Sequence, residues 1–232
     1  MTTLAALGPS AREAWKDSLL GEFPEEAVRV LLEGAKQQRL ASGESIQYLW
    51  EEPGRVFLIV EGLARVYVSS ESGREMTVRY VSRGEVVGLP ALVAGRSNPN
   101  VGIKVMIDTE VVLLSAMSLV RIASRDARVA WPIARYVAET LHVSEQLWGT
   151  NVFQQMPPRV AYHLLELCTR QGEDLVVHAT QDELARAVGS VREVVARTLK
   201  AFAREGVIER GSQVIRLLDP ARLHGIASSA AV

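Results

Sequence analysis

Short runs of β-branched and aromatic residues, separated by glycine turns, mark residues 39–115. Residues 55–60 and 63–68 form two such runs. The turns between the runs are predicted at Glu61-Gly62, Ser72-Gly73 and Arg83-Gly84. Several short strands at this regular spacing predict a small barrel or jelly roll. The segment before them, residues 11–38, has the spacing of helices.

The hydrophobic period changes to that of one long helix over residues 126–151. One stripe on this helix repeats at alternating steps of four and three residues, which is the spacing of a coiled-coil seam. The residues predicted to form this dimer seam are Val129, Ile133, Tyr136, Thr140, Val143 and Leu147. A second stripe, which includes Ala134, Leu141 and Trp148, is expected to pack on the β region. Two apolar stripes need two covering surfaces, so we favour a dimer helix over a single amphipathic helix buried against its own domain.

Pro157-Pro158 is predicted to end this helix and to start a new one. The new helix is predicted to run to about Gly172, which would place Cys168 on its apolar side. A short strand is predicted over residues 174–177.

The C-terminal third predicts two capped helices joined by a sharp turn and followed by a hairpin. Thr180 and Glu183 have the spacing of a capping box, and Ser190 and Glu193 repeat it ten residues later. Gly189 suits the tight turn between the helices, because it has no side chain to constrain the backbone. On the second helix the positions expected to face the core are Val191, Val195, Leu199 and Phe202.

The second of these helices leads with Arg192 and Glu193 and carries Arg197 about one turn further along. A guanidinium offers two parallel donors that match O6 and N7 of guanine, and a carboxylate can accept from the amino group of cytosine. These side chains predict base reading in the major groove of double-stranded DNA. The alternative is a solvated face with internal ion pairs. The capping boxes, the turn glycine and the hairpin, which together predict a winged helix-turn-helix, favour DNA binding.

The composition identifies no binding partner, but it excludes several classes of protein. The chain has 232 residues and a net charge of -1, so nucleic-acid binding must depend on a local patch. Its one cysteine, Cys168, excludes an internal disulfide and a four-cysteine cluster. No apolar run reaches the ~20 residues that cross a bilayer, and the N-terminus lacks the pattern of a secretory signal. We therefore expect a cytoplasmic protein with no membrane partner.

Residue inventory argues against an enzyme and against a metal site. The β region contains no histidine, and the chain has neither a P-loop nor a G-x-S-x-G elbow. Haem sensing would need an axial ligand, for which His142 on the long helix is the candidate, and a packing or surface role is favoured for it. We expect no catalytic residue, no metal and no required cofactor.

The segments VGSVREVVARTLKAFAREGVI and ESGREMTVRYVSRGEVVGL carry a family resemblance. The first resembles the recognition-helix region of the CRP/FNR superfamily, the bacterial regulators related to the cyclic-AMP receptor protein, and the second resembles the β-roll of that family. The resemblance covers about residues 20–218. It implies a homodimer on a two-fold symmetric site with a TGTGA-like half-site, with Arg192 and Arg197 on guanines and Glu193 opposite a cytosine. RNA polymerase is an expected partner.

The resemblance also implies contacts to the DNA backbone, for which Thr180, Ser190 and Lys200 are the candidates. Family members use the position of Asp182 for phosphate contacts as well, and a carboxylate there is a departure because it repels phosphate. Val194 is a second departure, since relatives often carry a hydroxyl at this position. The preference at the outer base pair of the half-site is therefore open.

The effector side of the family pattern fits less well. Cyclic-AMP binders place a glutamate after the glycine that corresponds to Gly88, and this chain has Leu89-Pro90 there. Arg96-Ser97 is the candidate for the Arg-Ser pair that holds the cyclic phosphate, although a surface-loop role for Arg96 is favoured. The residues expected around an effector pocket are Gly88, Leu89, Arg96, Ser97, Leu141 and Ser144. Another small ligand, a protein signal or no ligand is favoured over a cyclic nucleotide.

We predict an α+β chain with an N-terminal β-roll of the cyclic-nucleotide-binding jelly-roll type, a long dimerisation helix and a C-terminal winged helix-turn-helix. The predicted parts are an N-terminal extension (1–18), a β-roll sensor (19–125), a dimerisation helix and hinge (126–156) and a DNA-binding domain (157–232). The predicted function is sequence-specific transcription regulation, controlled through the β-roll or constitutive. The alternative is a small-ligand or cyclic-nucleotide-binding signalling protein whose winged helix serves a different partner.

Overall fold

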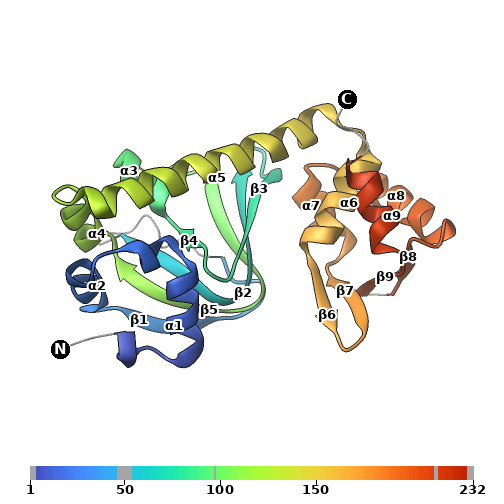
Figure 1. Cartoon of the computed structure of the whole chain (residues 1–232). Helices are drawn as coiled ribbons and strands as arrows, with labels where there is room; N and C mark the ends of the chain where they lie inside the picture. Colours follow the sequence, from blue (N-terminus) through green and yellow to red (C-terminus); the bar gives the residue numbers. More distant parts are fainter. Residues whose placement is uncertain (1–3, 46–53, 97, 212–213, 229–232) are drawn as a thin grey trace. The chain divides into compact units, whose positions relative to one another are not determined.

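The computed structural model describes residues 4–45, 54–96, 98–211 and 214–228 (Figure 1). They form two compact units. The first takes its residues from Met1–Val66 and Arg79–Val143, and the second from Tyr67–Val78 and Ser144–Val232. The long helix α5 (Ala127–Phe153) contributes residues to both units.

The first unit is built on the β-roll. Its sheet has the strand order β1 (Lys36–Leu40), β5 (Val101–Ser115), β2 (Arg55–Ser69) and β3 (Glu75–Ser82), and the short β4 (Val86–Val87) pairs with β2. The β1–β5 pair is antiparallel with Lys36 opposite Leu113, and the β2–β4 pair is antiparallel with Leu58 opposite Val86. The predicted mixture of a β-roll and helices is confirmed.

Alternate residues of β2 face two different hydrophobic cores, as the two-residue period of a strand requires. Val56, Leu58 and Val60 pack against the helices of the first unit, whereas Phe57 and Ile59 pack inside the roll. All five are buried, so this part of β2 is a continuous apolar run that is covered on both faces. Truncating Leu58 to alanine would cost about 2–5 kcal/mol of stability.

The helices that cover the first core include the N-terminal segment. They are η1 (Leu4–Ala6), α1 (Pro9–Asp17), η2 (Leu19–Glu22), α2 (Glu25–Leu32), α3 (Leu89–Ala94) and α4 (Ala116–Ala123). Trp15 of α1 is fully buried, and its indole N–H donates to the Leu20 carbonyl at 3.1 Å. Much of the predicted N-terminal extension is therefore part of the β-roll core.

Gly62 overturns the predicted turn at Glu61-Gly62. Strand β2 runs through this position without ending, and Gly62 has a φ of 107°. A Cβ at Gly62 would lie 2.4 Å from Thr109 Oγ1 and 2.6 Å from Thr109 Cα. The glycine lets β2 bend closely past β5, so one long strand replaces the two predicted short ones. The predicted glycine turns at Gly73 and Gly84 are confirmed, with φ values of 77° and 82°.

The long helix α5 begins directly after Asp126, whose carboxylate accepts from the Arg128 N–H at 2.9 Å. The Arg128 side chain also binds this carboxylate and lowers the pKa of Asp126. A carboxylate in this position satisfies a free amide of the first turn and favours the helix start.

The predicted dimer seam on α5 needs correction. Val129 and Ile133 are buried in the core of their own β-roll, and Tyr136 packs against the same core. Val129 and Ile133 are therefore covered by their own chain, whereas Tyr136 is only partly buried. Leu147 is also buried, and Val143 is exposed. The second predicted stripe does not pack on the β region, since Ala134, Leu141 and Trp148 are exposed. Thr140 of the predicted seam is half-buried.

The exposed stripe of α5 also follows a heptad. Ala127, Trp131, Ala134, Ala138, Leu141, Glu145 and Trp148 recur at alternating steps of four and three residues, and all are exposed. We call this set the outer stripe. Trp131 keeps 68% of its surface exposed, Leu141 52% and Trp148 40%. Large apolar side chains left open at this spacing are typical of a helix that pairs with another helix.

The second unit contains the winged helix-turn-helix. Its elements are α6 (Met156–Glu166), β6 (Cys168–Gln171), β7 (Asp174–His178), α7 (Gln181–Val188), α8 (Arg192–Arg204), β8 (Ile208–Arg210), β9 (Val214–Leu217) and α9 (Pro220–Ser228). The strands form a sheet in the order β6-β7-β9-β8, with Val176 opposite Arg216 and Ile208 opposite Leu217. Fully buried side chains from each helix close its core, namely Leu164, Leu184, Leu199 and Leu223.

Cys168 lies in a different element from the one predicted. Helix α6 ends at Glu166, and Cys168 is the first residue of strand β6, opposite Val177. Leu167 completes the apolar run of the helix, and the chain then pairs with β7. The Cys168 thiol is partly buried, and burial raises its pKa.

Candidate nucleic-acid interface

The first helix of the pair, α7, is held at both ends by hydrogen bonds. At its start the Thr180 hydroxyl accepts from the Glu183 N–H at 3.2 Å, and the Thr180 N–H donates to the Glu183 carboxylate at 2.8 Å. The predicted capping box is therefore confirmed. The Thr180 hydroxyl also donates to the same carboxylate at 2.9 Å, so a phosphate at this position must compete with Glu183.

The turn between the helices depends on Gly189. It has a φ of 66°, and the N–H of Ser190 donates back to the Ala185 carbonyl at 2.9 Å. This is the hydrogen-bond pattern that ends helices at a left-handed glycine. From α6, the Arg159 guanidinium donates to the Val188 carbonyl, and burial lowers the pKa of Arg159. These contacts fix the angle at which the chain enters α8.

The predicted second capping box at Ser190 is wrong. Helix α8 begins at Arg192, its N-cap is Val191, and no side chain caps it. The reason is that Ser190 belongs to the end of α7, where its N–H is used. Val191, which was expected to face the core, leaves 58% of its surface exposed for the same reason. Ser190 itself is half-buried.

Helix α8 divides its side chains between a buried and an exposed face. Val195, Leu199 and Phe202 are buried as predicted. Thr198 is buried with them, and its hydroxyl donates to the Val194 carbonyl at 3.1 Å. The three predicted base-reading residues, Arg192, Glu193 and Arg197, are all exposed. Lys200 is exposed as well. The three predicted base-reading side chains therefore lie on the exposed side of one helix.

An ion pair that the sequence did not predict joins the two helices. Asp182 Oδ2 of α7 lies 3.7 Å from Arg192 Nη1 of α8. Among the described residues, Arg197 and Lys200 have no ion pair. Helical spacing could not reveal this contact, because it joins residues of different helices across the turn.

Two arginines of the second unit, Arg216 of the wing and Arg222, form ion pairs with carboxylates of the same unit. Arg216 binds Glu209 at 2.7 Å and Asp174 at 3.2 Å. Arg222 of α9 binds Glu205 at the end of α8 at 2.6 Å. These two arginines are therefore already neutralised by carboxylates of the second unit.

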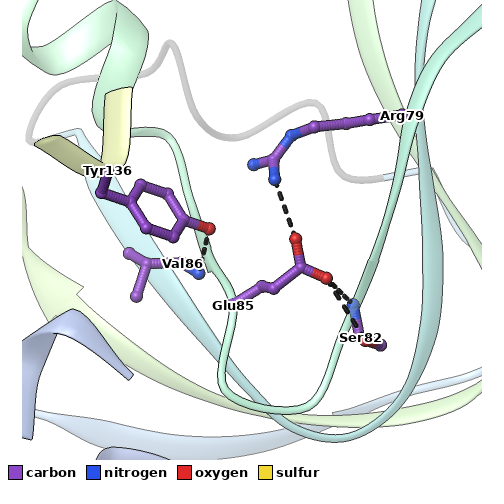
Figure 2. Close-up of polar contacts among 5 residues, drawn as sticks. All are labelled: Arg79, Ser82, Glu85, Val86 and Tyr136. Atoms are coloured by element: carbon purple, nitrogen blue, oxygen red, sulfur yellow. Dashed lines mark hydrogen bonds and ion pairs between the residues drawn. The ribbon is translucent and has the colours of Figure 1, made fainter. Parts of the chain in front are cut away.

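A partly buried polar network ties α5 to the β-roll (Figure 2). Arg79 Nη1 lies 3.0 Å from Glu85 Oε1, and the other carboxylate oxygen accepts from the Ser82 N–H at 2.7 Å. The Val86 N–H donates to the Tyr136 hydroxyl at 2.8 Å. The Arg79 guanidinium also lies 6.0 Å from the centre of the Tyr136 ring, which is the range of a cation–π contact.

The sequence carried a signal for this network. Thr77, Arg79 and Val81 alternate along β3 and are buried, so Arg79 is a charged residue at an inward position of a strand. Burial raises the pKa of the Tyr136 hydroxyl, and the positive charge of Arg79 opposes that shift. The network couples one face of α5 to the short strand β4.

The predicted effector residues that the structure describes lie in different surroundings. Leu89 is fully buried in the hydrophobic core, where it cannot line an open site. Gly88 has a φ of 102° and precedes α3. Arg96 lines a cavity of about 470 Å³ together with α3 and the residues that precede β5. Ser97 lies outside the described residues.

The two predicted effector residues of α5 have separate environments. Leu141 lies on the exposed outer stripe, whereas Ser144 is buried. In the described part of the chain, no group of three or more His, Cys, Asp and Glu residues could hold a metal ion. No helix there is long and apolar enough to cross a membrane.

Comparison with known proteins agrees with this geometry. Residues 158–226 match the Crp-like helix-turn-helix domain, and residues 37–126 match the cyclic nucleotide-binding domain. A β-roll and a winged helix-turn-helix, joined by one long helix, define a class of DNA-binding transcription regulators. The chain is 30% identical over 209 residues to the cyclic AMP receptor protein of Thermus thermophilus, covering 89% of this chain and 94% of that one. The chain belongs to the CRP/FNR family of transcription regulators.

Two further relatives agree. The cAMP-activated global transcriptional regulator Vfr of Pseudomonas aeruginosa is 24% identical over 188 residues, covering 77% of this chain and 87% of that protein. A solved structure of a CRP/FNR-family transcriptional regulator from Thermus thermophilus matches with a TM-score of 0.71 and 28% identity, covering 84% of this chain and all of that one.

Proposed function

We propose that this chain acts as a homodimeric, sequence-specific transcription regulator that binds a two-fold symmetric DNA site. The observation that carries the proposal is the exposure of Arg192, Glu193 and Arg197 on α8, whose opposite face is buried in the second unit. Charged side chains on a helix that is otherwise fixed by its core are suited to entering a groove without rearrangement.

The chemistry of these residues defines the half-site. Arg192 and Arg197 each offer parallel donors for O6 and N7 of a guanine, and Glu193 accepts from the N4 amino group of a cytosine. At about 1.5 Å of rise per residue, Arg192 and Arg197 are separated along α8 by roughly two base-pair steps. A TGTGA-like half-site has two guanines at this spacing.

The backbone contacts follow from the start of α8. Its first turn has no side-chain cap, so its amides are available to a DNA phosphate. Lys200 is exposed further along the helix, and Thr180 can contribute when Glu183 releases its hydroxyl. Ser190 is half-buried between α7 and α8. In the sequence it is the hydroxyl residue nearest to the first turn of α8.

The outer stripe of α5 is the surface that we assign to the second copy. Ala134 and Ala138 are small enough for two helices to approach closely, while Trp131, Leu141 and Trp148 supply apolar area. A dimer around this stripe would carry two α8 helices. Both can read one DNA face when they are about 34 Å apart, one turn of the double helix. RNA polymerase is the expected partner of the bound dimer.

The β-roll is the proposed input domain, and an effector other than a cyclic nucleotide, or no effector, is favoured over a cyclic nucleotide. Leu89 is buried where cyclic-AMP binders carry a glutamate, so the chain offers no carboxylate to the ribose at that position. The buried guanidinium of Arg79, which lies near Tyr136 of α5, is already paired with Glu85. A cyclic phosphate would have to displace that carboxylate.

Fluorescence anisotropy with labelled DNA tests the proposal. Wild-type protein should bind a symmetric TGTGA…TCACA duplex more tightly than a scrambled duplex of equal length. Arg192→Ala and Arg197→Ala should each lose about 1–3 kcal/mol of binding free energy on the matched site. Arg83→Ala is the control, because Arg83 is an exposed, ion-paired arginine of the first unit. Equal binding to both duplexes by wild type would contradict the proposed function.

A further inference from the structure

A cavity of about 570 Å³ opens among the N-terminal helices of the first unit. Its lining residues come from η1, α1, η2 and α2, which all belong to that unit. It reaches inward to Trp15, Leu20 and Leu32, which are buried members of the hydrophobic core. Cavities of about 300–1,000 Å³ with mostly apolar walls are the usual sites of small ligands in proteins. This cavity therefore has the size and the depth of a ligand site.

The inner walls of the cavity are apolar. The indole N–H of Trp15 already donates to the Leu20 carbonyl at 3.1 Å, so this donor is in use. Phe23 is buried in the wall, and Val28 of α2 and Leu4 of η1 are half-buried beside it. Because these walls match hydrocarbon and not a polar group, the inner part of a ligand must be an apolar chain or ring.

The charged residues that line the cavity are exposed and so lie at its opening. Lys16 of α1 and Arg29 of α2 are cationic, and Glu25 of α2 is the one carboxylate in the lining. Asp17, which follows Lys16 in the chain, pairs instead with Arg83 at 3.5 Å. Among the described residues, neither Lys16 nor Arg29 has an ion pair. Two cations and one carboxylate leave a positive charge in excess, which favours an anionic group at the opening.

We propose that this cavity binds a small amphipathic carboxylate, a molecule with an apolar chain or ring and one carboxyl group. The apolar part lies against Trp15, Phe23 and Val28. The carboxylate lies at the opening, where Lys16 and Arg29 provide the positive charge. Burial of the apolar part supplies most of the affinity, and the two cations select an anion over a cation. The site does not depend on the proposed function, because binding to it requires no DNA.

The cavity shares a wall with a segment that is joined to α5. Leu20 and Gly21 of η2 line the cavity, and the next residue, Glu22, forms an ion pair with Arg135 of α5. A ligand that contacts Leu20 therefore touches the segment that is ion-paired to the long helix. The buried lining residues belong to the core that packs against the helices, not to the core inside the roll. None of the predicted effector residues lines this cavity.

An NMR titration of the full chain with sodium decanoate, below the concentration at which it forms micelles, tests the proposal. The indole N–H resonance of Trp15 should shift and reach saturation, because its ring lies in the cavity wall. The indole of Trp131, which is exposed on the outer stripe, is the reference for nonspecific binding. Each methylene added between hexanoate and decanoate should raise the affinity about two- to four-fold. Decyltrimethylammonium, which has the same chain and a cationic group, should bind more weakly than decanoate.

Single substitutions assign the binding to the two parts of the cavity. Lys16→Gln and Arg29→Gln should each weaken decanoate binding about two- to five-fold, the range of an exposed ion pair. Glu25→Gln removes the opposing carboxylate and should strengthen it. Val28→Trp fills the cavity and should abolish the shift of the Trp15 resonance. Lys36→Gln is the matched control, because Lys36 is an exposed lysine of β1 that does not line the cavity.

Thermal unfolding by circular dichroism checks that Val28→Trp is folded. The charge variants keep the test decisive if it is not, because they change exposed side chains. Saturable binding that is weaker in Lys16→Gln and Arg29→Gln, and unchanged in Lys36→Gln, would support the site. A Trp15 resonance that does not saturate, equal binding of the cationic probe, or wild-type affinity in a folded Val28→Trp would each overturn it.

Discussion

Tyr136→Phe removes one hydroxyl from the network that joins α5 to the β-roll, and its cost follows from the environment. The Val86 N–H donates to that hydroxyl, and Val86 is fully buried, so water cannot replace the lost acceptor. A buried donor left without an acceptor costs about 1–3 kcal/mol. The phenylalanine ring keeps the packing and the cation–π contact with Arg79, so the loss should stay within that range.

Hydrogen exchange of the Val86 amide, followed by NMR, is the most direct assay for this change. The amide should exchange faster in Tyr136→Phe, and urea unfolding of the first unit should have a lower midpoint. Tyr162→Phe is the control, since Tyr162 is a partly buried tyrosine of the second unit that interacts with Glu166. Unchanged protection of Val86 together with an unchanged midpoint would refute the structural role given to Tyr136.

The same tyrosine predicts a dependence on alkaline pH. Burial raises the pKa of Tyr136 above its ordinary value of 10.0, so the folded state favours the neutral phenol. The stability from this preference is complete below pH ~10, the unfolded value, and is lost as the pH rises from there through the raised folded pKa. The difference in unfolding free energy between wild type and Tyr136→Phe should therefore narrow above pH ~10. A difference that stays constant from pH 8 to about 11 would contradict the shift.

Three further predictions concern α8, the outer stripe of α5 and the bend of β2 at Gly62. Lys200→Ala should weaken binding to all DNA and reduce the slope of log affinity against log salt by about 1, measured by anisotropy, whereas an unchanged slope would exclude a phosphate contact. Trp131→Glu should shift the protein toward monomer in sedimentation velocity, unlike Met117→Glu, which alters an exposed apolar residue off the outer stripe. Gly62→Ala should lower thermal stability more than Gly73→Ala, because both have positive φ but only Gly62 lies against Thr109.

The fold was predictable because each part of the chain has its own hydrophobic period. The same local rules located the capping box at Thr180 and the left-handed turn at Gly189. They failed at Ser190, where the end of one helix and the start of the next compete for one residue. Capping patterns give only the spacing, and the hydrogen bond from Ser190 to Ala185 decided the outcome.

The stripes of α5 show a different limit. Two apolar faces could be recognised from spacing, but which of them meets the roll depends on the shape of the sheet. Tyr136 looks apolar in a heptad count, yet its hydroxyl is needed to accept from Val86. Likewise Leu89 was expected beside an effector and is buried in the core. The sequence around Leu89 could not predict this burial, because it does not show which elements pack against the residue.

Cys168 has a practical consequence. It is the one cysteine of the chain, it lies at the start of β6, and it is only partly buried. A thiol-reactive spin label or dye therefore attaches at a single place in the second unit. Because burial raises the thiol pKa, labelling should be slow at neutral pH and faster in mildly alkaline buffer. Two labelled copies in a symmetric dimer would give one label-to-label distance. The change of this distance on adding DNA would directly measure the movement of the two winged helix-turn-helix units.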